Sequence, residues 1–301
     1  MKRIRYLFLS MGIAVAPIAA QVFSEVPFPV ASLTGVAAAN SANSNDLWSV
    51  FINPAGLSRI TQIQTGAAYH QLYNLSFLSH QSAAVAVPLR QWGCAAVSYQ
   101  SQSTQYTGVA LTSESALRFS HSFFLQKDLL SALAVGYNVN CYHLEYGHSA
   151  GGSGDGSDGV DLGQGWGIGL DFGLQANLRE RHWIGLTVTN AGNSTLGDGL
   201  SNHSLPKSIT VGFAYEPYAQ VMTSLAIHQP LGDFPTQYRG GLVYELNDWI
   251  VLRSGVYVQP GSLTLGFGLN RWGMQCDYAY LHHPVLPGTH QISCGYRFKA
   301  R

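Results

Sequence analysis

The chain has 301 residues, a formal net charge of +0, 46% hydrophobic residues and only 11% charged residues. Soluble domains carry about 25% charged residues, so something other than water should cover much of this surface. The neutral charge also argues against nucleic acid as a partner, because neutralising phosphates requires clustered Lys and Arg.

Residues 1–20 have the pattern of a secretory signal peptide. Lys2, Arg3 and Arg5 precede an apolar run, and Ile18-Ala19-Ala20 supplies a small-residue cleavage site. We therefore expect the mature chain to begin at Gln21. Beyond this leader no apolar stretch reaches 18 residues, so we expect no transmembrane helix.

Residues 21–60 are rich in Ala, Ser and Asn and alternate only weakly. They precede the first predicted strand, so we expect a hatch or plug segment tucked into a barrel; a loose periplasmic tail is the alternative. The compact motif here is 51–58. Asn53-Pro54 favours a turn and Gly56 tolerates a positive φ, so the piece can bend sharply and seat Phe51 and Leu57 on a wall.

Residues 61–301 form the expected barrel domain, in which alternation with period 2 is sustained almost everywhere. One parity reads Trp166, Ile168, Leu170, Phe172, Leu174, and the other reads Gly167, Gly169, Asp171, Gly173, Gln175. Transmembrane strands place apolar residues toward lipid and small or polar residues toward the lumen in this way. A soluble β-sandwich would carry Lys, Glu and Thr on its outward faces instead.

We therefore predict an all-β fold, a transmembrane antiparallel up-and-down β-barrel of about 14 strands. The expected strands are 62–71, 77–88, 92–103, 110–123, 130–146, 165–177, 182–190, 206–216, 220–229, 238–246, 249–258, 261–270, 273–281 and 290–298.

The links between these strands alternate in length. Six are short, near 89–91, 125–128, 179–181, 216–218, 247–248 and 271–272, whereas the two longest, 147–165 and 191–206, both fall on the other side. Outer-membrane barrels have short periplasmic turns and longer outer loops. We therefore expect a bacterial outer-membrane location with both termini periplasmic and lipid as a partner.

The inward parity carries eight charged residues of both signs. They are Arg118, Asp171, Glu216, Arg239, Glu245, Arg253, Asp277 and Arg297. Their balance suggests a salt-bridge network that fills a narrow barrel; a polar conduit is the alternative. Among the four cysteines, Cys276 and Cys294 share the outward parity of the last two strands, where a disulfide between opposite residues can form. No cysteine spacing fits a metal site, and we expect neither metal nor cofactor.

Two parts of the chain resemble a known family. Asn53-Pro54-Ala55-Gly56-Leu57 ahead of the first strand is similar to FadL-type outer-membrane proteins and the related PorV/PorQ group. Asp277-Tyr278-Ala279-Tyr280 and Gly295-Tyr296-Arg297-Phe298 resemble the closing hairpin of PorV/PorQ-like members. The resemblance implies a fourteen-stranded barrel with an N-terminal hatch.

The resemblance offers two functions. The first is a non-enzymatic component of type IX protein secretion or cell-surface assembly, with secretion-system or surface proteins as partners. The alternative is FadL-like transport of hydrophobic small molecules, with Phe51, Asn53, Pro54, Gly56 and Leu57 forming part of a hatch near the ligand. A rim-bound hydrolase is a third hypothesis, motivated only by abundant His and Ser. The S-x-x-K pattern of Ser204 and Lys207 does not indicate catalysis, because Pro206 prevents the helical turn that this pair would need. We expect no enzyme.

Overall fold

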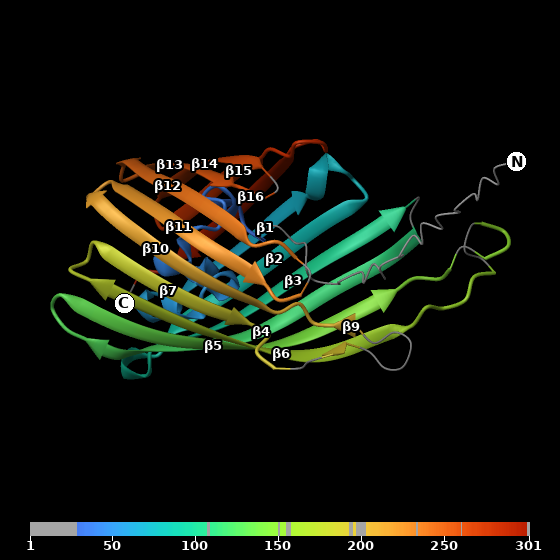
Figure 1. Cartoon of the computed structure of the whole chain (residues 1–301), viewed down its shortest axis with the longest axis horizontal. Helices are drawn as coiled ribbons and strands as arrows, with labels where there is room; N and C mark the ends of the chain where they lie inside the picture. Colours follow the sequence, from blue (N-terminus) through green and yellow to red (C-terminus); the bar gives the residue numbers. More distant parts are fainter. Residues whose placement is uncertain are drawn as a thin grey trace, which may run out of the picture.

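The computed structural model describes residues 29–106, 109–149, 151–154, 158–192, 195–196, 203–232, 234–259 and 261–299. The expected signal peptide, 1–20, lies outside the described residues. Fourteen antiparallel strands form a closed barrel, in which the first strand pairs with the last (Figure 1). The barrel predicted from the alternation is therefore confirmed.

The barrel strands are β1 (Gln64–Gln71), β2 (Leu78–Pro88), β3 (Cys94–Tyr106), β4 (Val109–Lys127), β5 (Ser131–Tyr146), β6 (Gln164–Leu178), β7 (His182–Thr189), β10 (Ser208–Tyr218), β11 (Val221–Pro230), β12 (Gln237–Asn247), β13 (Ile250–Tyr257), β14 (Ser262–Arg271), β15 (Met274–Leu281) and β16 (Thr289–Arg297). A small hairpin of β8 (Thr195–Leu196) and β9 (His203–Ser204) lies in the link between β7 and β10. The helices are α1 (Ala31–Thr34), η1 (Asn40–Ala42), η2 (Leu47–Phe51), η3 (Pro54–Arg59), η4 (Leu72–Asn74) and η5 (Arg90–Trp92).

The largest difference from the predicted strands is in β4. We expected this strand to end at residue 123, where Phe123 and Phe124 are adjacent apolar residues. The pairing with β5 instead shifts register between Phe124 and Gln126 and continues to Lys127. An irregularity of this kind absorbs one extra residue and lets a ladder continue where a sequence pattern fails.

The outer face of the barrel is apolar. Large side chains of the outward parity, among them Ile168, Phe213, Leu225, Leu265 and Ile292, are exposed. Such a band is expected where lipid replaces water around a barrel. None of the described helices has the length and apolar character needed to cross a membrane.

The two ends of the barrel differ. Every second link is a turn of two to five residues, and we call this side the short-turn end; the opposite side is the long-loop end. Trp92, Tyr218, Trp249 and Trp272 are exposed in or beside the short turns. Aromatic girdles of this type mark membrane interfaces.

Residues 29–60, which we call the plug, lie inside the barrel (blue in Figure 1). Its short helices contact different walls: α1 contacts β14–β16, η1 contacts β7, β10 and β11, η2 contacts β1–β3, and η3 contacts β3–β6. Leu33, Trp48, Val50 and Leu57 of the plug pack with small inward residues of β1–β3 such as Ala84 in one apolar core. The small residues on the inward parity thus leave the space that the plug fills.

Candidate functional site

Asn53 holds the plug together and ties it to the wall. Its Oδ1 accepts a hydrogen bond from Ala55 N at 3.1 Å and so caps η3. Its Nδ2 donates to Ser41 O at 2.8 Å and to Leu174 O of β6 at 3.0 Å. The side chain is fully buried. One amide therefore connects η3, η1 and the barrel.

The motif around Gly56 is a capped 3-10 helix, with Pro54 in its first turn. Gly56 does not have a positive φ, so this motif turns without using the conformational freedom of glycine. A Cβ at Gly56 would lie 2.4 Å from Ser44 O and 2.7 Å from Ser49 Oγ. The glycine is required because other parts of the plug approach it closely.

Inward glycines of the barrel also face the plug. A Cβ at Gly136 of β5 would lie 2.4 Å from Ala55 N, and one at Gly173 of β6 would lie 2.2 Å from Asn53 Oδ1. Two strands from β6, a Cβ at Gly212 of β10 would lie 2.2 Å from Ser41 Oγ. The plug backbone thus rests directly on the strands, at separations that no larger residue permits.

Phe51 and Leu57, expected near a ligand, have different surroundings. Phe51 stacks on Trp48 with ring centroids 6.2 Å apart, and the Arg118 guanidinium lies 5.1 Å from its centroid. Arg118 also donates to Gln100 Oε1 at 2.9 Å. Leu57 is fully buried in the core between plug and wall. Of the two, only Phe51 faces the charged inner wall.

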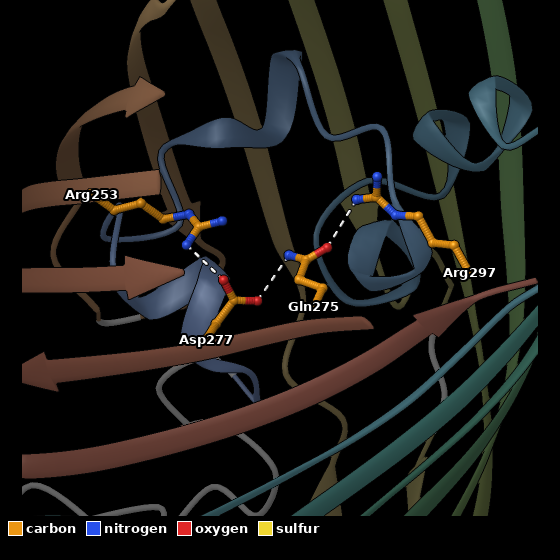
Figure 2. A network of polar contacts seen from close by, with 4 residues as sticks. All are labelled: Arg253, Gln275, Asp277 and Arg297. Carbon is orange, nitrogen blue, oxygen red and sulfur yellow. Dashed lines mark hydrogen bonds and ion pairs between the residues drawn. The ribbon is translucent and has the colours of Figure 1, made fainter. Parts of the chain in front are cut away.

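Figure 2 shows a chain of polar contacts that joins β13, β15 and β16. Arg253 Nη1 lies 2.7 Å from Asp277 Oδ1, Gln275 donates to Asp277 Oδ2 at 2.8 Å, and Arg297 donates to Gln275 Oε1 at 2.9 Å. Arg253 and Asp277 form the one ion pair among the residues that the structure describes. Gln275, an uncharged residue, extends that pair toward Arg297.

The remaining inward charges contact amides or lie near the barrel end. Asp171 is buried and accepts from Asn138 at 3.0 Å, Asn140 at 2.8 Å and the Asn190 amide at 2.9 Å. Arg239 donates to Gln237. Glu216 and Glu245 lie toward the short-turn end, where Glu245 is exposed. Amides satisfy a buried charge without the cost of desolvating a second one, and the sequence pattern did not reveal these partners.

Asp46 lies in the plug and caps η2, because its Oδ1 accepts from Trp48 N at 3.0 Å. Burial raises the pKa of this carboxyl, and the nearby positive charge of Arg297 acts in the opposite direction. The carboxyl is therefore easier to protonate in the docked plug than in an unfolded chain.

A second covering element lies at the long-loop end. Leu196 and Leu205, in the link between β7 and β10, are buried against Tyr142 and Leu144 of β5. Asn190 anchors this link, since its Oδ1 accepts from Tyr142 Oη at 3.0 Å and its Nδ2 donates to the Pro206 carbonyl at 2.8 Å. We call it the outer cap. The sequence signal for it was the presence of leucines in a mostly polar loop.

Cys276 and Cys294 face each other in the β15–β16 ladder. Their Sγ atoms lie 3.0 Å apart, and both residues are free thiols in this structure. The expected register is present, while the expected disulfide stays a prediction.

Comparison with known proteins places the fold among outer-membrane barrels. No family model and no curated protein matches the sequence. The structure is similar to that of "CymD monoaromatic hydrocarbon channel", with a TM-score of 0.64 and 13% identity over 90% of this chain and 98% of that one. It is similar to the Pseudomonas putida toluene transporter TodX, with a TM-score of 0.58 and 14% identity over 85% and 95%. A Pseudomonas aeruginosa FadL homologue matches with a TM-score of 0.51 and 11% identity over 90% and 98%.

At these identities the comparisons establish the fold alone. The chain has the architecture of FadL-like bacterial outer-membrane barrels. The first two names describe transport proteins. Proteins with the same fold can have different functions, so the residues inside the barrel are the evidence for function.

Proposed function

We propose that this protein is an outer-membrane channel for hydrophobic small molecules, gated by the plug. The observation that carries the proposal is the plug itself, a segment of short helices packed inside a closed barrel of fourteen strands. The shared fold with a hydrocarbon channel and a toluene transporter supports the same function. The sequence suggested this transport function as the alternative to a role in type IX secretion, and it is the main proposal here.

The route begins at the outer cap. Leu196 and Leu205 occupy an apolar site against Tyr142 and Leu144, and a hydrophobic guest can replace these leucines without leaving polar groups unpaired. Passage beyond the cap requires the plug to move. The plug is held by hydrogen bonds such as those of Asn53 and by apolar packing, both of which can break and re-form.

We also propose that both termini lie in the periplasm. The alternation of short turns and long loops supports this orientation. In this orientation the outer cap faces the medium and the plug is anchored on the periplasmic side.

The secretion hypothesis rests on the closing hairpin, β15–β16. Residues in this hairpin already have structural partners: Asp277 pairs with Arg253, and Tyr278 Oη lies 2.6 Å from His290 Nδ1. These contacts give the polar side chains of the hairpin a structural role that needs no partner protein. The names of the similar structures describe transport proteins and not secretion components.

A deletion strain with two measurements separates the hypotheses. The first measurement is uptake of radiolabelled toluene by intact cells, and the second is the amount of exported protein on the cell surface. We expect uptake to fall and surface protein to stay unchanged, with uptake restored by the wild-type gene. Unchanged uptake with reduced surface protein would overturn the proposal and support the secretion hypothesis.

A further inference from the structure

A row of polar side chains crosses the inner wall toward the long-loop end. Neighbouring strands place five residues directly opposite one another: Gln291 on β16, His70 on β1, His80 on β2, Gln102 on β3 and Glu114 on β4. We call these residues the polar row. His70, His80 and Gln291 are each no more than 1% exposed, although all three belong to the inward parity.

The centre of the polar row lacks hydrogen-bond partners. Both ring nitrogens of His70, both of His80 and the Oε1 of Gln102 are buried without a partner. Buried polar atoms are nearly always paired, and leaving one unpaired is costly. The lumen does satisfy another histidine, since His228 Nδ1 lies 2.8 Å from Thr210 Oγ1. The unpaired atoms therefore call for a specific explanation.

The chemistry of these atoms favours an uncharged, hydroxylated guest. A neutral imidazole offers one donor and one acceptor, and a hydroxyl can complement both. The rings of His70 and His80 stack on each other with centroids 4.7 Å apart and an interplanar angle of 26°, so their four nitrogens lie close together.

Two other kinds of ligand fit less well. An anionic head group would meet Glu114, the carboxylate at the end of the row. A metal ion needs about three or four protein ligands, and the described part of the chain contains no group of three or more His, Cys, Asp or Glu residues suited to one. The polar row instead supplies uncharged imidazoles and an amide oxygen.

We propose that the polar row binds the hydroxyl of aromatic alcohols, so that the channel prefers phenolic guests to pure hydrocarbons of the same shape. The inference rests on the proposed transport function and narrows its substrate class. His70 and His80 exchange hydrogen bonds with the hydroxyl, while Gln102 Oε1 provides a further acceptor.

The test compares p-cresol with toluene, which differ by one hydroxyl. Binding of each radiolabelled compound is measured by equilibrium dialysis against the full barrel in lipid nanodiscs, with empty nanodiscs subtracted. We expect wild-type protein to bind p-cresol about five- to tenfold more tightly than toluene. In the His70→Leu/His80→Leu variant this ratio should fall to about one while toluene binding is kept. His228→Leu, which alters a lumen histidine that already has a partner, should leave the ratio unchanged.

The outcomes separate the two proposals. If neither compound binds above empty nanodiscs, the transport function itself fails. If both bind but the wild-type ratio is near one, or the double variant keeps the wild-type ratio, the polar row is not the hydroxyl site and only this inference is overturned. Heat-modifiable gel migration shows whether each variant is folded. Should the double variant not fold, Gln102→Leu serves instead, with an expected two- to threefold drop in the ratio.

Discussion

Replacing Asn53 by alanine gives the most direct test of how the plug is held. The change removes the cap of η3 and both donated hydrogen bonds, to Ser41 O and Leu174 O. The barrel strands keep their own ladder in this variant. The effect should therefore appear as opening of the plug and not as loss of the barrel.

The magnitude follows from the three lost bonds. A helix cap contributes about 1 kcal/mol, and each neutral hydrogen bond contributes about 1 kcal/mol net. The docked plug should therefore lose about 3 kcal/mol, which corresponds to a roughly hundredfold increase in its open fraction. Asn43→Ala is the matched control, because it removes a single bond from Ser224 Oγ at 3.2 Å and should raise opening less than about tenfold.

Hydrogen exchange of the Gly56 and Ile60 amides, which donate to backbone carbonyls that the substitution leaves in place, is followed by mass spectrometry in detergent and measures the opening. Asn53→Asp distinguishes the contributions, since it keeps the cap acceptor but places a carboxylate oxygen against two carbonyls. It should open the plug at least as much as Asn53→Ala. A change of less than about threefold for Asn53→Ala, or near wild-type exchange for Asn53→Asp, would refute the assignment of the anchor to these bonds.

Three further predictions follow from the same geometry. Gly136→Val should displace the plug and raise single-channel conductance, because a Cβ at this position would lie 2.4 Å from the Ala55 amide nitrogen. The control is Gly261→Val, which should leave the conductance unchanged because no atom lies within 4 Å of a Cβ there. The raised pKa of Asp46 means that the docked plug binds a proton more tightly than the unfolded chain, so its stabilising effect is complete below about pH 4 and declines as pH rises through the raised value. Asp46→Asn keeps the cap acceptor and should flatten the pH dependence of the thermal midpoint. Cys276 and Cys294 should lose two protons and two electrons to a periplasmic thiol oxidase and form a disulfide, giving two maleimide labels before reduction and four after it.

Period-2 alternation was sufficient to predict the barrel. Lipid and lumen impose opposite polarity on the two faces of every strand, so each of the fourteen strands carried the signal independently. The prediction was least accurate at β4, where Phe123 and Phe124 are adjacent and an irregular pairing replaces strict alternation. A shift in the pairing register between two strands cannot be detected from the alternation of apolar and polar residues alone.

The interior was harder to predict because its partners are distant in sequence. For Gly56 the sequence indicated only tolerance of a positive φ, whereas its actual constraint is the close approach of Ser44. The balanced charges suggested mutual pairing, but Asp171 is satisfied by Asn138 and Asn140. Parity identifies which side chains face the lumen; it does not identify which of them meet.

The plug has a consequence for how the molecule is assembled. Thr34, made early in synthesis, donates to Gln291, which lies 257 residues later in the chain. Contacts of such sequence separation pay a large loop-closure entropy and form slowly. The N-terminal segment cannot find its final contacts until the last strand exists, and the seam between β1 and β16 closes beside it. Barrel closure and plug docking should therefore behave as one late kinetic step.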